Sequence, residues 1–171
     1  MIGFYPDLFH PPADQPGTAA AYPECGQGWL DVLDRACIRI RAAVEADGAP
    51  FKFTQIKEKY ASLRVDWDGA LSPAATAHVE NAIVLAEARS ACTCEECGEE
   101  GFLHQSGDWL TTRCATHAEG KPVDPRPGFE NLHIVRQFAA GRMNAITCRR
   151  YNRETDSFTD VDPSELGIEE E

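Results

Sequence analysis

Two pairs of metal-ligating residues, Cys94-Glu-Glu-Cys97 and Cys114-Ala-Thr-His117, carry the clearest chemistry in this sequence. Within each pair, the spacing lets both side chains point at one cation from a tight turn. Together they supply three thiolates and one imidazole, a tetrahedral set that is typical of a closed structural zinc site. Because four protein ligands leave no position for water, we expect one structural Zn²⁺ per chain and no catalytic metal.

Two other residues near these pairs offer alternative ligands. Cys92 adds a third thiol beside the first pair, although the C-x-x-C spacing favours Cys94 with Cys97. His104 lies between the pairs, and its residue type favours a surface position over a metal ligand. Chance spacing or thiol redox chemistry is the alternative to zinc, and it is disfavoured because the two pairs occur together.

The residues around the pairs follow the order of a treble-clef zinc finger. Gly98 suits the left-handed backbone of a knuckle directly after Cys97. Residues 101–113 hold two short apolar stretches around Gly107-Asp108, which predicts a hairpin. The second pair is then expected to open a short helix, which completes a treble-clef-like module at 92–120.

Upstream, the sequence predicts two amphipathic helices joined by a hairpin. Apolar residues recur at three- and four-residue steps over residues 29–46, and Gly48 and Pro50 are typical of a helix exit. Residues 51–56 and 63–67 alternate apolar and polar, as expected for an antiparallel pair of strands. Ser72 and Pro73 open a second helix that runs to about Ser90 and into the first metal-ligating pair.

The two ends of the chain are more irregular in composition. The first 28 residues are rich in Pro, Ala and Gly and predict an extended arm. Residues 131–140 fit a short helix, and 146–151 with 157–161 fit a terminal hairpin. The expected fold is therefore α+β, with two amphipathic helices, a short antiparallel sheet and an embedded treble-clef-like zinc finger. Its parts are the arm (1–28), a helix-hairpin-helix core (29–91), the zinc module (92–120), and a linker, hairpin and acidic tail (121–171).

The net charge of −12 is unevenly distributed along the 171 residues. Residues 154–171 contain eight acidic and no basic residues, whereas 126–153 contain six Arg against Glu130 alone. Arg142, Arg149, Arg150 and Arg153 are therefore a candidate binding patch that the acidic tail would screen. A solvated strand face and a solubilising terminus are the preferred alternative.

Cysteine usage and the lack of an apolar segment bear on location. Three of the seven Cys belong to the predicted metal site, and the other four, Cys25, Cys37, Cys92 and Cys148, show no disulfide framework, so a reducing cytoplasm is expected. No Lys or Arg precedes Arg35, and no apolar run reaches membrane length, so we expect neither a secretory signal nor a membrane anchor.

Three motifs in order carry a resemblance to a protein family. The first motif is Cys25-Gly-Gln-Gly-Trp29, and the second is Thr54-Gln-Ile-Lys-Glu-Lys-Tyr60 with Leu63-Arg64. The third is Cys94-Glu-Glu-Cys97-Gly with Trp109-Leu-Thr-Thr-Arg-Cys114-Ala-Thr-His117. Through these motifs, residues 22–118 resemble small uncharacterised zinc-finger proteins of bacteria, phages and prophages. The resemblance implies a bacterial host cytoplasm and supplies no activity. The C-terminal residues lie outside it.

Enzymatic functions find little support in these residues. Cys25-Gly-Gln-Gly28 lacks the Lys-Ser/Thr ending of a phosphate loop, and a capping turn explains it better than a nucleophile does. A nuclease would need further His or Asp ligands near His104. We therefore expect no catalytic residues and no enzymatic activity.

The two remaining function classes are both binding functions. The acidic composition favours a protein-binding adaptor or inhibitor that acts on a host or phage protein, for example a defence-system component. The alternative is nucleic-acid binding through the arginine segment, which overall acidity opposes.

Overall fold

The computed structural model describes residues 1–14, 17, 19–139 and 142–168, with side chains described outside 136–145. The chain forms two compact units, Met1–Pro122 and Val123–Glu171. Within the part of the chain that is described, no helix has the length and apolar character needed to cross a membrane.

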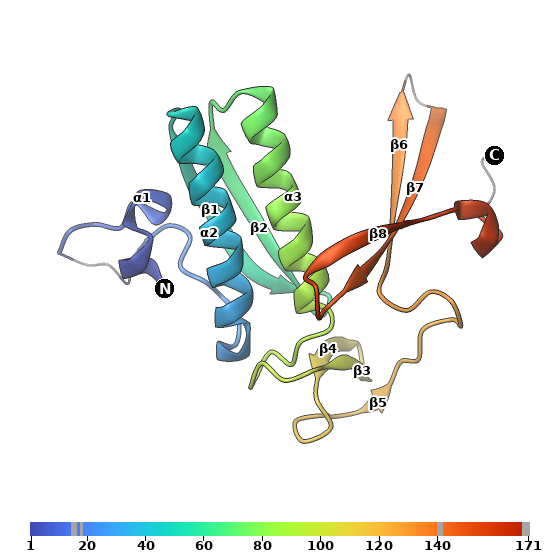
Figure 1. Ribbon diagram of the computed structural model, residues 1–171. Coiled ribbons are helices and arrows are strands. Elements are labelled where there is room, and N and C mark those ends of the chain that lie inside the picture. The colour runs from blue at the N-terminus through green and yellow to red at the C-terminus, as the bar shows by residue number, and fades with distance from the viewer. Residues whose placement is uncertain (15–16, 18, 140–141, 169–171) are drawn as a thin grey trace. The chain divides into compact units, whose positions relative to one another are not determined.

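In the first unit, two helices pack on a two-stranded sheet. Helices α2 (Leu30–Asp47) and α3 (Pro73–Ser90) lie side by side against the hairpin of β1 (Phe51–Lys59) and β2 (Ser62–Gly69) (Figure 1). The buried residues of α2 recur at helical spacing and pack into one apolar cluster with those of α3 and β1, since a periodic apolar face must pack against another element. These residues form a mixed α/β core, as the sequence predicts.

Local signals set the ends of both helices. The Ser72 hydroxyl accepts a hydrogen bond from the Ala75 N–H at 3.3 Å, and Pro73 occupies the first turn of α3. Gly48, with φ of 75°, ends α2 in the left-handed conformation. The predicted bounds of both helices are thus confirmed to within a few residues.

The β1–β2 hairpin is tighter than the sequence suggests. Its strands extend to Lys59 and Ser62, so that only Tyr60 and Ala61 form the turn, with φ of 54° and 63°. Positive φ at both turn residues matches the twist of the strands, but it usually requires Gly or Asn. Here the Glu58 carboxylate accepts a hydrogen bond from the Ala61 N–H at 2.7 Å, which stabilises the turn.

The N-terminal segment is not the extended arm that its composition suggests. It contains two short helices, η1 (Ile2–Phe4) and α1 (Pro6–Phe9), followed before α2 by η3 (Gln27–Trp29). Leu8 and Phe9 of α1 are 0% and 2% exposed, because they complete the apolar cluster beside β1. This segment therefore belongs to the core.

After α3 the chain enters a small three-stranded sheet that carries the metal-ligating pairs. Strands β3 (Phe102–Ser106) and β4 (Trp109–Arg113) form the predicted hairpin around Gly107-Asp108, and β5 (Lys121–Pro122) pairs with β3. The sheet order is β4-β3-β5.

The second unit is an antiparallel sheet of order β6-β7-β8. It comprises β6 (Leu132–Ala139), β7 (Arg142–Asn152) and β8 (Ser157–Val161), followed by η4 (Pro163–Leu166). The helix predicted at 131–140 is therefore wrong. Its short apolar run has no strong helical period, and pairing with β7 makes it a strand. The predicted hairpin between 146–151 and 157–161 is present as β7–β8.

Candidate metal centre

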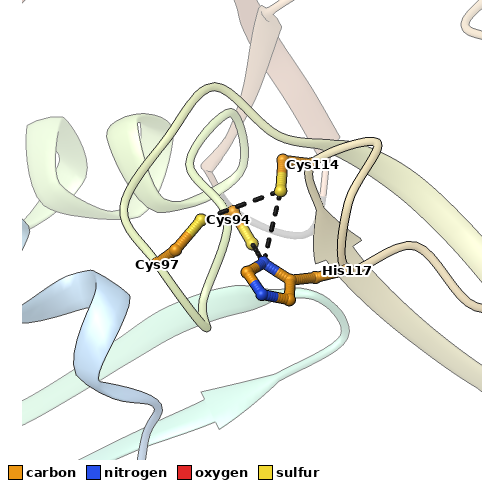
Figure 2. Close-up of side chains that lie close together, drawn as sticks. All are labelled: Cys94, Cys97, Cys114 and His117. Carbon is orange, nitrogen blue, oxygen red and sulfur yellow. Dashed lines mark hydrogen bonds between the residues drawn. The ribbon is translucent and has the colours of Figure 1, made fainter.

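The structure brings the four predicted ligands into one cluster. The sulfur atoms of Cys94, Cys97 and Cys114 and a ring nitrogen of His117 all lie within 4.8 Å of one another (Figure 2). Among the residues that the structure describes, this is the group of His, Cys and acidic side chains arranged to hold a metal ion. The sequence prediction of which side chains converge is thus matched by their positions.

Interatomic distances within the cluster fit a tetrahedral ion. Zinc bond lengths of about 2.3 Å to sulfur and about 2.0 Å to nitrogen imply S···S edges of about 3.8 Å and S···N edges of about 3.6 Å. The Cys97 and Cys114 sulfurs lie 3.7 Å apart, and Nδ1 of His117 lies 3.6 Å and 3.3 Å from the sulfurs of Cys94 and Cys114. A metal ion that accepts sulfur ligands and prefers tetrahedral coordination, such as Zn²⁺, therefore fits this set of four ligand atoms.

The backbone around the cluster favours the thiolate form at Cys94 and Cys114, whereas hydrogen bonds with these two side chains help to raise the pKa of Cys97. Burial raises the pKa of the Cys94 thiol, but backbone hydrogen bonds at Cys114, Cys97 and Glu96 outweigh it and lower that pKa below its ordinary value. Burial is likewise outweighed at Cys114 by backbone hydrogen bonds at His117 and Thr116, so its pKa is also lowered. Deprotonated sulfur is the form that ligates a metal.

Each ligand pair is held by a compact turn. In the first, the Gly98 N–H donates to the Cys94 carbonyl at 2.8 Å, and Gly98 has the left-handed φ of 83° that its position predicts. In the second, the His117 N–H donates to the Cys114 carbonyl at 3.0 Å. Residues 115–117 form a turn, so the short helix expected at the second pair is absent from this segment.

The two alternative ligands lie elsewhere. The Cys92 thiol donates to the carbonyls of Ala88 and Arg89 at the end of α3, at 3.6 Å and 3.3 Å. His104 is buried, with 8% of its surface exposed, and not on the surface as its residue type suggests. Its Nδ1 lies 2.9 Å from the Phe102 carbonyl oxygen, and His104 is paired with Pro122 of β5. Neither residue belongs to the cluster.

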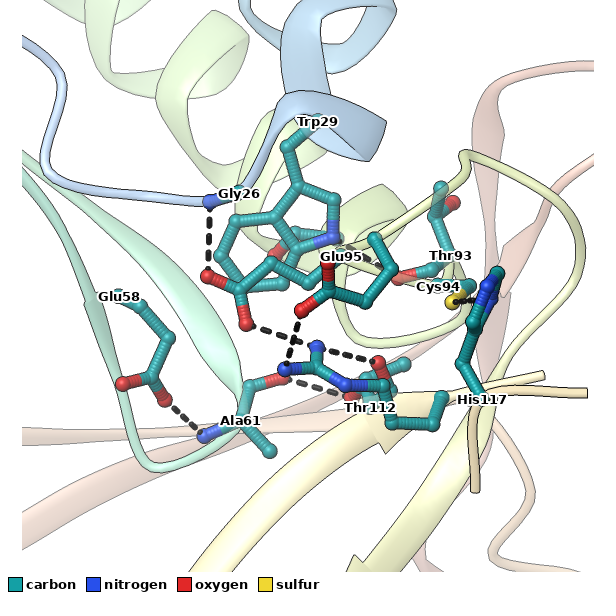
Figure 3. Close-up of polar contacts among 12 residues, drawn as sticks. Gly26, Trp29, Glu58, Ala61, Thr93, Cys94, Glu95, Thr112 and His117 are labelled. Carbon is teal, nitrogen blue, oxygen red and sulfur yellow. Dashed lines mark hydrogen bonds and ion pairs between the residues drawn. The ribbon is translucent and has the colours of Figure 1, made fainter. Parts of the chain in front are cut away.

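The Cys25-Gly-Gln-Gly-Trp29 motif packs directly on the first ligand pair (Figure 3). The Gly28 N–H donates to the Glu95 carbonyl at 2.7 Å, and the Trp29 indole donates to the Thr93 carbonyl at 2.8 Å. A Cβ at Gly28 would lie 2.3 Å from the Cys94 carbonyl oxygen and 2.7 Å from the Cys97 nitrogen. Glycine is thus required here by the close approach of two backbones.

Glu95 joins this motif to the β3–β4 hairpin. Its Oε1 accepts from the Gly26 N–H at 2.9 Å, and its Oε2 pairs with Nη1 of Arg113 at 2.9 Å. The side chains of Glu95 and Arg113 are only 12% and 16% exposed. Sequence reasoning missed both residues, because the partners lie 69 and 18 positions away in the chain.

The candidate arginine patch does not form a single surface in the residues described. Arg149 and Arg150 are consecutive on β7 and point to opposite faces of the strand. Arg149 stacks over Phe158 at 4.3 Å, and Arg150 donates to the Gly128 and Glu130 carbonyls. Arg153 is partly buried beyond the strand, and the Arg142 side chain lies outside the described residues.

Comparison with known proteins gave no match: no family model, no curated protein and no solved structure is similar to this chain.

Proposed function

We propose that this chain is a non-enzymatic, zinc-stabilised protein-binding module, an adaptor or inhibitor that contacts a basic protein partner. The observation that carries the proposal is an acidic metal module with exposed aromatic side chains. Residues 92–120 contain six acidic residues against Arg113 alone. Trp109 and Phe102 of this module are 78% and 61% exposed.

Exposed aromatic residues among charges are typical of binding surfaces. Trp is enriched at the centres of protein interfaces, because its large ring loses much solvent contact at little cost in conformational entropy. Acidic side chains around it would steer a basic partner toward the surface and disfavour acidic ones. This combination supports protein binding through the metal module.

Catalysis has less support. A closed set of three thiols and one imidazole offers no open coordination position. Cys25, which the sequence offers as a possible nucleophile, is half-buried, and burial together with the charge of Glu95 raises the pKa of its thiol to about 11. A thiol with that pKa is protonated at neutral pH and is a weak nucleophile.

The finer features of the fold are part of the same proposal. The order of knuckle, hairpin and second pair supports a treble-clef-like module, in which a turn replaces the terminal helix. The buried stripes of α2 and α3 support two amphipathic helices. The resemblance of residues 22–118 supports a partner from a bacterial host or phage, and a cytoplasmic location.

Charge-matched variants test the proposed function. The first variant, Glu99→Gln/Glu100→Gln/Asp108→Asn, neutralises three exposed acids of the metal module. The control, Glu24→Gln/Glu45→Gln/Glu80→Gln, removes the same charge from exposed positions elsewhere in the first unit. Each zinc-loaded, tagged protein captures partners from bacterial lysate with and without nuclease treatment, and mass spectrometry identifies them.

We expect wild type and control to recover the same basic protein, and the metal-module variant to lose it. Recovery that depends on intact nucleic acid would contradict the proposal. Equal recovery by both variants would also contradict it, since the acidic module would then play no part.

A further inference from the structure

A hollow of about 610 Å³ lies beside the metal centre, along the β3–β4 hairpin. Trp109, Thr111 and Arg113 of β4 line it together with Glu96, His117 and Glu119. Both ligand pairs thus contribute to its wall, through Glu96 from the first and His117 from the second. Metal binding would hold these walls in place.

The charges that face this hollow are mainly negative. Its one basic residue, Arg113, pairs with Glu95 at 2.9 Å and with Glu96 at 3.1 Å, so two carboxylates share its charge. Glu96 nevertheless keeps 54% of its side chain exposed, and Glu119 is exposed as well. A bound metal with three thiolates would add a further net negative charge. An anion is therefore disfavoured in the hollow, and a cation is favoured.

The Trp109 ring favours a guanidinium group over other cations. Indole gives the strongest attraction to a cation placed over its face, and a planar guanidinium stacks on such a ring while it donates to carboxylates at its edge. Trp109 is 78% exposed and stands within the same hollow as the two carboxylates. A guanidinium would satisfy both the ring and the carboxylates.

We propose that this hollow binds an arginine side chain of the partner, stacked on Trp109 and hydrogen-bonded to Glu96 and Glu119. The assignment rests on the proposed function, since it names the residue type through which a basic partner is recognised. The ligand class is an arginine-containing peptide segment.

Three blocked peptides that differ at one residue test the assignment. They carry arginine, lysine or citrulline at the centre of the same Gly/Ser sequence, so that citrulline keeps the planar shape and removes the charge. The zinc-loaded full chain is titrated with each, and the indole N–H signal of Trp109 is followed by NMR, assigned from the Trp109→Phe variant. We expect the arginine peptide to bind about tenfold more tightly than the citrulline peptide, with lysine between them.

Variants of exposed residues, titrated by calorimetry because Trp109→Ala lacks the indole signal, localise the binding. Trp109→Ala and Glu96→Gln are expected to weaken binding of the arginine peptide about tenfold. Phe102→Ala removes another exposed aromatic ring, which does not line the hollow, and it should leave the affinity unchanged. Equal binding of all three peptides, or wild-type affinity in Trp109→Ala, would overturn the assignment.

The two proposals fail separately. If Trp109→Ala still captures the protein partner that Glu99→Gln/Glu100→Gln/Asp108→Asn loses, the hollow is not the arginine site, although the chain is still a protein-binding module. If the arginine peptide binds at Trp109 but capture of every protein is independent of the acidic residues, the arginine site is supported and the proposed function is contradicted.

Discussion

Replacing Gly28 by Ala should weaken the metal centre although it replaces none of the four ligand residues. The added Cβ would lie 2.3 Å from the Cys94 carbonyl oxygen, 2.5 Å from the Gly98 nitrogen and 2.7 Å from the Cys97 nitrogen, where ordinary contacts begin at 3.4 Å. All three atoms are backbone atoms, so no side-chain rotation relieves the contact. The first ligand pair must therefore move by about 1 Å relative to η3, whereas metal–ligand distances tolerate about 0.2 Å.

Two costs follow from that displacement. Forcing a methyl group into a closely packed site costs about 1–3 kcal/mol. Misplacing groups that orient metal ligands lowers metal affinity about 10- to 100-fold. Ala favours helix more than Gly does, so backbone propensity at this position would act in the opposite direction. A loss of stability would therefore report the close approach itself.

The assay compares zinc affinity, by competition with a chromophoric chelator, and urea denaturation at saturating zinc. Gly3→Ala is the matched control, because no atom lies within 4 Å of its added Cβ. We expect Gly28→Ala to lose zinc affinity and about 2 kcal/mol of stability, and Gly3→Ala to lose neither. Wild-type zinc affinity in Gly28→Ala would refute the coupling between this motif and the metal centre.

Three further predictions address the ligand set, a buried hydrogen bond and a buried thiol. Cys97→Ser should reduce zinc well below one atom per chain by elemental analysis and lower the thermal midpoint, because metal binding contributes on the order of 10 kcal/mol to the folding of such modules; full zinc content would refute the assignment. Thr112→Val removes the buried hydrogen bond from the Thr112 hydroxyl to the Ala61 carbonyl, 2.7 Å long, and should cost about 1–3 kcal/mol in urea denaturation, whereas the neighbouring Thr111→Val should change stability by less than about 0.5 kcal/mol. Burial, with the nearby charge of Asp34, raises the pKa of the Cys37 thiol in the folded chain from 9.0 to about 12. The contribution of this thiol to stability is therefore complete below pH 9 and is lost as the pH rises toward 12. Cys37→Ala should reduce the fall in the free energy of unfolding between pH 8 and 10, measured by urea denaturation, and an unchanged fall would contradict the account.

The features that sequence predicted well depend on nearby residues. Ser72 and Pro73 define the start of α3 through contacts within one turn, and the hairpin at Gly107-Asp108 follows from its turn residues. The ligand pairs are similar, since each spans four residues and only their meeting requires the fold. In each of these cases, the residues that form the sequence pattern also make the contacts that produce the structure.

The features that sequence missed depend on distant partners. The turn at Tyr60 and Ala61 lacks the usual Gly or Asn, and it is stabilised by Glu58 and by the Thr112 hydroxyl from β4. The burial of Phe9 depends on its packing against Phe53 of β1, with ring centroids 5.0 Å apart. The composition of a segment contains no information about such long-range contacts, so composition alone predicts an extended arm for the N-terminal segment.

The charge of the metal centre bears on which partner the first unit can accept. Three thiolates and one imidazole around a divalent ion would carry one net negative charge, so a bound ion would not make the module basic. Six acidic residues surround this centre within residues 92–120, and only Arg113, already paired with Glu95 and Glu96, opposes them. Affinity for a polyanion requires several basic contacts to phosphates, because release of their counterions drives the binding. The charges of the metal module therefore oppose binding of a polyanion, and the proposal of a basic protein partner rests on these same charges.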